Sequence, residues 1–116
     1  MAAITPTKRL KFSPELVSKI LSREKTSTWR VDDDKDLRMG DIVACMDAST
    51  GETFAMVQLT EVFSKPFHDL LTEDHAGHET YASDEERYAW FSAQYRKPVG
   101  PNTIVKVARF VLLPSS

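Results

Sequence analysis

Residues 25–30, KTSTWR, place three hydroxyl side chains between two basic residues. A hydroxyl can act as a nucleophile when a neighbouring lysine is neutral for part of the time and accepts its proton. Lowering a lysine pKa from about 10.4 to about 7.5 requires about 4 kcal/mol from burial and nearby positive charge. Arg23 and Arg30 flank Lys25 and could supply part of this energy. Taken alone, however, these residues favour the simpler interpretation, a polar surface strand.

Other motifs that carry chemistry are weaker. The glycines lie at positions 40, 51, 77 and 100, too scattered for a phosphate-binding loop. His75 and His78 have acidic neighbours, as in a metal cluster, but no cysteine lies near them, and the composition favours a polar surface loop. The acidic run at residues 32–36 is interpreted as a solvated loop, because adjacent carboxylates repel one another unless a cation lies among them. We therefore expect no metal and no cofactor.

Composition indicates one small soluble domain. The chain has 116 residues, of which 41% are hydrophobic and 28% charged, and no apolar run is long enough to span a membrane. Residues 1–7 do not resemble a signal peptide, and the single Cys45 cannot form an internal disulfide. We expect a cytoplasmic monomer with one domain over residues 1–116 and a core over about 9–113.

Charge is distributed unevenly along the chain, although the net charge is only −2. Residues 1–30 carry seven basic and two acidic side chains. Residues 31–95 carry four basic and fifteen acidic side chains, and residues 96–116 carry four basic side chains and no acidic ones. This balance argues against indiscriminate nucleic-acid binding. A local cationic surface would arise only if the two basic ends meet in space.

The hydrophobic pattern predicts an α+β fold, either a small mixed sheet or a partly open barrel. Alternating or β-branched stretches predict strands at 9–12, 26–31, 41–47, 53–63 (with a bend or bulge) and 104–113. A helix should begin at Pro14 after the N-cap Ser13, and another should cover 83–95 behind the capping box of Ser83 and Glu86. Residues 64–80 should form a helical turn followed by a loop.

The order of these elements resembles the ASCH domain, a β-barrel related in fold to the PUA RNA-binding domain. The most specific matching motifs are KTSTWR at 25–30 and MGD at 39–41, supported by DLLTEDH at 69–75. The resemblance covers about residues 9–113. It implies a PUA-like barrel of five to six strands with two to three short helices.

A small single-domain branch of this family, similar to this chain in length and motif, hydrolyses N(4)-acetylcytidine to cytidine and acetate. The resemblance implies that Lys25 is the proton acceptor, Thr28 the nucleophile and Glu79 the proton donor. The branch needs no cofactor. An oxyanion stabiliser is also required, either Arg30 or a backbone N–H near residues 25–28.

The residues around this trio are expected to contact the substrate. Trp29, Tyr81 and Trp90 could stack on a base, as aromatic residues do in nucleobase sites. The full set of expected substrate-binding residues is Thr26, Ser27, Trp29, Arg30 and Tyr81.

Two features depart from the family pattern. The family usually has a glycine two residues before the lysine, and Arg23 occupies that place, so we expect a different local turn. The helix at 83–95 is also longer than the smallest members require. We expect these two departures to affect the choice of substrate more than the fold.

Other functions fit the same residues. The alternative is a non-catalytic RNA- or nucleotide-binding module, in which Lys25 and Arg30 contact phosphate or base and Glu79 accepts from a base edge. A ribonuclease and an interaction domain without a ligand are further possibilities. No membrane partner is expected.

Geometry tests the proposed trio. Residues three apart in a regular strand face opposite sides, so Lys25 and Thr28 could not cooperate within one strand. We therefore predict that Lys25 lies in the turn after the helix and that the strand begins at Ser27 or Thr28. Thr28 and Arg30 would then share the cleft face, with Trp29 on the other.

Overall fold

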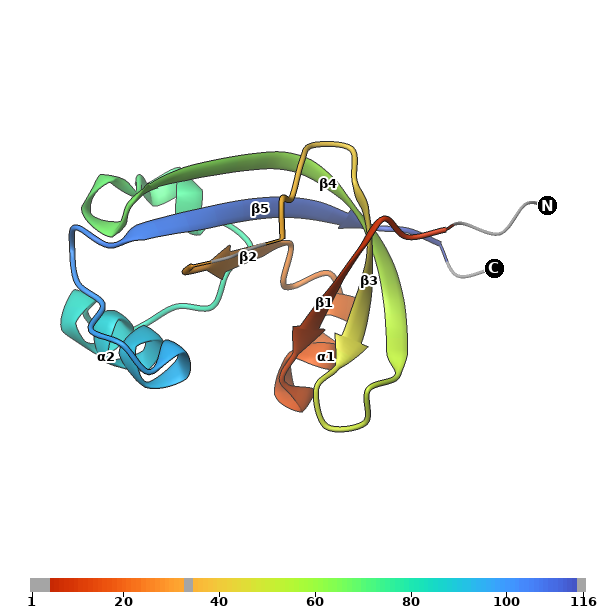
Figure 1. Cartoon of the computed structure of the whole chain (residues 1–116), viewed down its shortest axis with the longest axis horizontal. Helices are drawn as coiled ribbons and strands as arrows, with labels where there is room; N and C mark the ends of the chain where they lie inside the picture. The colour runs from red at the N-terminus through yellow and green to blue at the C-terminus, as the bar shows by residue number, and fades with distance from the viewer. Residues whose placement is uncertain (1–4, 33–34, 115–116) are drawn as a thin grey trace.

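A computed structural model describes residues 5–32 and 35–114, and within these ranges the chain forms a five-stranded sheet with order β1-β3-β4-β5-β2 (Figure 1). β1 pairs parallel with β3, and all other pairs are antiparallel. The sheet curls into a half-barrel, so the predicted small PUA-like α+β fold is confirmed. The strands are β1 (Lys8–Phe12), β2 (Ser27–Arg30), β3 (Ile42–Asp47), β4 (Thr53–Pro66) and β5 (Ile104–Leu112).

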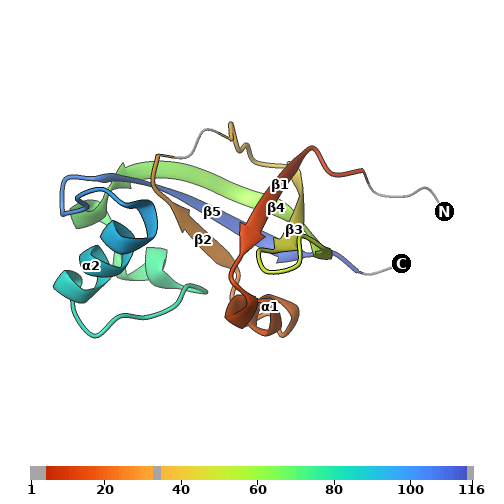
Figure 2. The ribbon, with the colours of Figure 1, turned by 60° about the horizontal axis from the view of Figure 1, so that its bottom comes forward.

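Two α-helices lie on the same side of the curled sheet (Figure 2). α1 (Pro14–Leu21) connects β1 to β2, and α2 (Asp84–Tyr95) precedes β5. Two 3-10 turns, η1 (Phe67–Asp69) and η2 (Thr72–His75), follow β4. Within the described residues no helix has the length and apolar character needed to cross a membrane.

The core has two parts, joined by the long strands β4 and β5. One cluster lies where α1 packs near β1 and β3, and it includes Leu10, Phe12, Ile20, Val43 and Phe110. The other packs β2 and β5 against α2, and it contains Trp29, Val31, Phe67, Phe91, Val105 and Val107. β4 and β5 therefore hold the two ends of the sheet in a fixed relation.

Most predicted elements are present close to their expected bounds. The bulge predicted in the long return strand is found as a register shift between Leu59 and Glu61. Pro66 ends that strand and a 3-10 turn follows, as expected. The Ser83 hydroxyl accepts a hydrogen bond from the Glu86 backbone N–H at 3.1 Å, which confirms the N-cap of α2.

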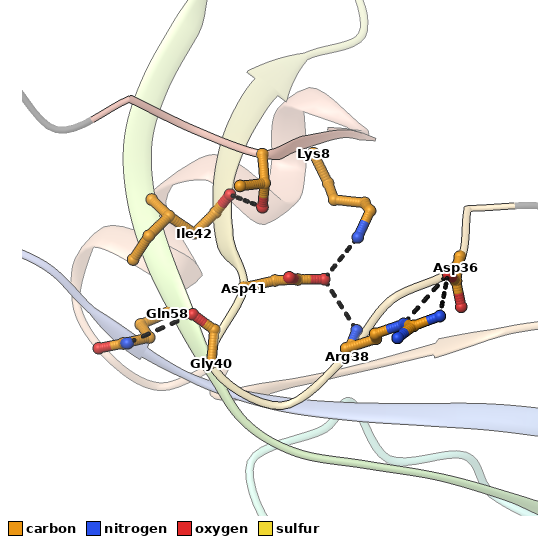
Figure 3. Close-up of polar contacts among 8 residues, drawn as sticks. Lys8, Asp36, Arg38, Gly40, Asp41, Ile42 and Gln58 are labelled. Atoms are coloured by element: carbon orange, nitrogen blue, oxygen red, sulfur yellow. Dashed lines mark hydrogen bonds and ion pairs between the residues drawn. The ribbon is translucent and has the colours of Figure 1, made fainter.

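The MGD motif forms a turn that ties the start of β1 to β3 (Figure 3). An Asp41 carboxylate oxygen accepts from the Arg38 backbone N–H at 2.8 Å and from Lys8 Nζ at 2.7 Å. Gly40 has a φ of +93°, a conformation that side chains rarely adopt. In this chain the motif therefore fixes the turn that leads into β3.

The end of α1 sets the position of Lys25. Arg23 has a φ of 69°, its N–H donates to Ile20 O at 3.1 Å, and the Lys25 N–H donates to Lys19 O at 3.0 Å. We expected a different turn because an arginine replaces a glycine here. This expectation is wrong, since Arg23 itself takes the left-handed conformation.

The first prediction concerns this strained position. Arg23→Gly should have a free energy of unfolding about 1 kcal/mol higher than Arg23→Ala, because glycine adopts the left-handed conformation without a Cβ penalty. Urea unfolding measures the difference. Ser22, with a φ of −81°, is the control, and Ser22→Gly should show no such gain over Ser22→Ala. Equal stability of the two Arg23 variants would contradict the argument.

Candidate functional site

A cavity of about 290 Å³ opens between β2, the corner where β1 leads into α1, and helix α2. Lys25, Thr28 and Glu79 all line it. They come from the turn after α1, from β2 and from the loop before α2, so the fold brings together residues that are far apart in the sequence.

Lys25 is nearly inaccessible, with 3% of its surface exposed. Its Nζ donates to Glu79 Oε2 and to Ser27 O, each at 2.7 Å. β2 begins at Ser27, as predicted, so Lys25 lies outside the strand and its direction is not tied to strand alternation. This is how Lys25 and Thr28, three residues apart, line the same cavity.

Burial and neighbouring charge act in opposite directions on the pair. Burial is the main cause that lowers the pKa of Lys25, and it outweighs the opposing effect of the Glu79 carboxylate. Burial by itself would raise the pKa of Glu79, but His78 and Lys25 outweigh it, so this pKa is lowered. The two residues therefore rest as an ion pair whose ammonium gives up its proton more readily than an exposed lysine does.

The loop that carries Glu79 is docked at Gly77 beside Thr26, the residue before β2. The Thr26 N–H donates to Gly77 O at 2.8 Å, and Gly77 has a φ of +75°. A Cβ at Gly77 would lie 1.9 Å from the Thr26 hydroxyl oxygen. Only glycine fits this contact, and the contact helps to hold Glu79 beside Lys25.

His78 is a site residue that sequence reasoning placed on a polar surface loop, and that expectation is wrong. Its side chain is 4% exposed and stacks on Trp29, with ring centroids 3.9 Å apart and an angle of 12° between planes. Its Nδ1 lies 3.0 Å from Glu79 O, which can only accept, so Nδ1 carries the proton. Burial, followed by the charge of Lys25, lowers the pKa of His78 to about 4.

Asp74, from the same segment, is also buried rather than solvated. Its carboxylate accepts from Lys65 Nζ at 2.7 Å and from the Leu71 N–H at 2.8 Å. Arg109 on β5 approaches it at 3.4 Å. These contacts fix the η2 turn to β4 and β5 and so position the loop that follows.

The expected substrate-binding residues separate into two groups. Trp29 and Arg30 line the cavity, although Trp29 also packs in the second core cluster. Thr26, Ser27 and Tyr81 lie outside the lining. Ser27 is fully buried with no partner for its hydroxyl among the residues that the structure describes, and Tyr81 packs beside Phe91.

Most of the other residues that line the cavity were not predicted from the sequence. The corner between β1 and α1 supplies Lys11, Phe12, Ser13 and Leu16, and α2 supplies Phe91, Gln94 and Tyr95 together with Trp90, already considered as a stacking residue. The helical period places residues 90 and 94 on one face of α2, a signal that could have found Gln94. No local pattern links the β1 corner to residues 25–30.

Basic residues from the two ends of the chain do meet, but not through adjacent first and last strands. β1 and β5 are separated in the sheet, whereas β2 pairs with β5 and places Arg30 opposite Lys106. Lys11 reaches the cavity from the opposite edge. Over residues 5–32 and 35–114, the lysine, arginine and carboxylate side chains that line the cavity are Lys11, Lys25, Arg30 and Glu79.

No cluster of three or more His, Cys, Asp or Glu side chains over 5–32 and 35–114 is placed to hold a metal ion. The acidic run at 32–36 includes residues 33 and 34, which lie outside the described residues.

The curled five-stranded sheet with a cavity at the end of α1 defines a small PUA-like α+β domain. The family model of the ASCH domain matches residues 2–112, so the chain belongs to the ASCH domain family. No match was found among curated proteins.

Solved structures share this fold. Protein EF3133 from Enterococcus faecalis V583 is 19% identical, with a TM-score of 0.74 over 97% of this chain and 83% of that chain. An ASCH domain from Lactobacillus crispatus JV V101 is 12% identical, with a TM-score of 0.63 over 90% and 78%. A mutant ZmASCH protein from Zymomonas mobilis is 14% identical, with a TM-score of 0.63 over 92% and 70%. At these identities the likeness shows the fold alone.

The Gly77 contact gives a prediction with a built-in control. Gly77→Ala should lower the free energy of unfolding by about 3 kcal/mol, from the left-handed backbone and the collision with Thr26. Gly51→Ala, at a φ of +76° with nothing within 4 Å, should cost only about 1 kcal/mol. Chemical unfolding compares the two variants, and equal losses would show that the Thr26 contact is not tight.

His78 predicts a pH dependence of stability. Between pH 6.5 and about 4 the unfolded chain protonates this residue while the folded chain does not. The free energy of unfolding should therefore fall by up to about 3 kcal/mol as the pH is lowered through this window. His78→Phe, which keeps a ring on Trp29, should lose this contribution.

The control for His78 is His68→Gln, because the His68 side chain is 49% exposed. Urea unfolding at several pH values measures each slope. A wild-type slope in His78→Phe between pH 6.5 and 4 would contradict a role of His78 in this pH dependence.

Proposed function

We propose that this protein is an amidohydrolase that removes the acetyl group from N(4)-acetylcytidine or a similar acylated nucleoside. The observation that carries the proposal is the buried Lys25, which contacts Glu79 at 2.7 Å and shares a cavity with Thr28. Of the three hydroxyl residues in the KTSTWR motif, Thr28 alone lines that cavity. Thr28 is therefore the proposed nucleophile.

The Lys25–Glu79 pair can supply both a base and an acid. Transfer of one proton from the Lys25 ammonium to the Glu79 carboxylate leaves a neutral amine and a neutral carboxylic acid. The pair has no net charge before or after this transfer. A bound substrate that excludes water favours the neutral form, because burial penalises the two separate charges.

Acylation then follows from these two neutral groups. The Thr28 hydroxyl gives its proton to Lys25 while its oxygen attacks the acetyl carbonyl carbon. The resulting tetrahedral intermediate breaks its C–N(4) bond, and the leaving nitrogen takes the Glu79 proton. Cytidine leaves, and an acetyl ester remains on Thr28 beside a charged lysine and carboxylate.

Deacylation reverses the proton movements. Water attacks the ester and gives a proton to the Glu79 carboxylate, and the Thr28 oxygen recovers its proton from Lys25. Acetic acid is released and ionises in water. Arg30, in the cavity wall, is a candidate to stabilise the oxyanion in both steps.

The cavity favours a nucleoside over a long nucleic acid. Its volume of about 290 Å³ is near the lower limit of small-molecule sites. A non-catalytic nucleotide-binding module is the second candidate. The observation that favours it is the resting state of Lys25, whose ammonium already donates to Glu79 and Ser27 and so is not yet a base.

The test is incubation with N(4)-acetylcytidine and measurement of released cytidine by chromatography. Wild type should release cytidine, and Thr28→Ala, Lys25→Ala and Glu79→Gln should each lower kcat/KM by about 100-fold or more. Thr28→Ser keeps a hydroxyl and should retain measurable turnover. Thr60→Ala, at an exposed threonine of β4, is the matched control and should behave as wild type.

Mass spectrometry provides a second measurement on the same samples. A short reaction quenched in acid should show one added acetyl group on the peptide that contains Thr28. Absence of turnover by the wild type, together with measurable nucleoside affinity, would contradict the amidohydrolase and support the binding module.

A further inference from the structure

Trp90 differs from the other aromatic residues of α2. Its exposed fraction is 44%, whereas Phe91 is buried and Tyr88 and Tyr95 pack against the second core cluster. Trp90 lines the cavity all the same. A large indole that is half exposed at a cavity wall buries only part of its apolar surface in the core, and it leaves the rest available for contact with a ligand.

The orientation of the indole is set by aromatic neighbours. Phe91 meets Trp90 edge to face, with ring centroids 4.8 Å apart and planes at 75°. Tyr81 lies at 6.2 Å with planes at 54°. Tyr81, which the sequence suggested as a substrate contact, is therefore placed to support Trp90 instead.

Gln94 follows Trp90 by one helical turn and lines the same cavity. Residues four apart lie on one face of a helix, so the indole and the carboxamide form adjacent parts of one wall. The carboxamide offers both a donor and an acceptor. Lys25, Thr28 and Glu79 belong to other walls, which come from β2 and the loop before α2.

We propose that Trp90 and Gln94 are the specificity-determining residues of this site, and that they recognise the pyrimidine ring of an acylated nucleoside. The indole stacks on the ring, and the Gln94 carboxamide hydrogen-bonds to its edge. The edge of an N(4)-acylated cytosine carries the ring acceptors O2 and N3 and the amide N–H, which match a carboxamide. The inference rests on the proposed function and names the part of the substrate that α2 binds.

A binding experiment tests the stacking separately from catalysis. Cytidine is the probe, because it has no acetyl group to lose, and tryptophan fluorescence and calorimetry are recorded in parallel. The chain has two tryptophans and both line the cavity, but Trp29 is 3% exposed and Trp90 44%, so we expect most of the saturable quenching of wild-type emission to come from Trp90. Trp90→Phe, which retains Trp29, separates the two contributions. Ribose alone should not quench.

The variants should behave differently from one another. Trp90→Phe should lose most of the quenching but keep its calorimetric affinity within about 3-fold, whereas Trp90→Ala should bind cytidine about 10-fold more weakly. Leu21→Ala is the matched control, because Leu21 is an exposed apolar residue of similar exposure, 46%, outside the cavity lining. It should change neither measurement.

Gln94 is tested in the same assay. Gln94→Ala and Gln94→Glu, which removes the donor, should each weaken cytidine binding by about 5-fold. Gln58→Ala on β4, outside the cavity lining, is the control and should bind as wild type does.

The outcomes separate this inference from the proposed function. Wild-type turnover of N(4)-acetylcytidine with unchanged cytidine affinity in Trp90→Ala and Gln94→Ala overturns the inference and leaves the amidohydrolase standing. Quenching and affinity that depend on Trp90 and Gln94, without any turnover, support base recognition and count against the amidohydrolase. Absence of cytidine binding by the wild type overturns the inference.

Discussion

The burial of the Lys25 ammonium is the constraint on which the rest of the site depends. A charged group removed from water is tolerated only when partners replace its hydration, and Glu79 Oε2 and Ser27 O, both at 2.7 Å, do this. The carboxylate must come from another part of the chain, so the loop before α2 has to dock on the start of β2. Gly77 permits the close approach, and the left-handed turn at Arg23 directs the chain from α1 into this position.

The docked loop is held by contacts of different physical kinds. His78 stacks on Trp29 and joins the loop to the core of β2 and β5, while its Nδ1 donates to the backbone at Glu79. Four residues before His78, the buried Asp74 carboxylate accepts a hydrogen bond from Lys65 on β4. Because apolar stacking and paired charge both hold this segment, the carboxylate of Glu79 has a defined place beside Lys25. Precise placement of this kind is what proton transfer requires.

The cavity also brings together basic residues from separate parts of a chain whose net charge is −2. Pairing of β2 with β5 sets Arg30 opposite Lys106, and Lys11 reaches the same cavity from the β1 edge. Of the acidic residues that the structure describes, Glu79 lines the cavity. The cavity volume of about 290 Å³ has room for a small ligand, and the proposed nucleoside is of that class. The aromatic and amide wall from α2 is consistent with such a ligand.

By itself the sequence determined what depends on neighbours within a few residues: the strand periods, the Ser83 cap and a bulge partway along the strand predicted over 53–63. The strand start at Ser27 or Thr28 was predicted from the resemblance, which requires Lys25 and Thr28 to act together. The motif resemblance also indicated the family, and the family model matches residues 2–112. Only the tertiary structure decided that Lys25 is buried, that His78 belongs to the core and that the corner between β1 and α1 forms a wall of the cavity. The physical reason is the separation along the chain of the residues that interact. Caps and periodicity are set by local hydrogen bonds and side-chain alternation, whereas the Lys25–Glu79 contact joins residues 54 positions apart and exists only after the sheet has curled.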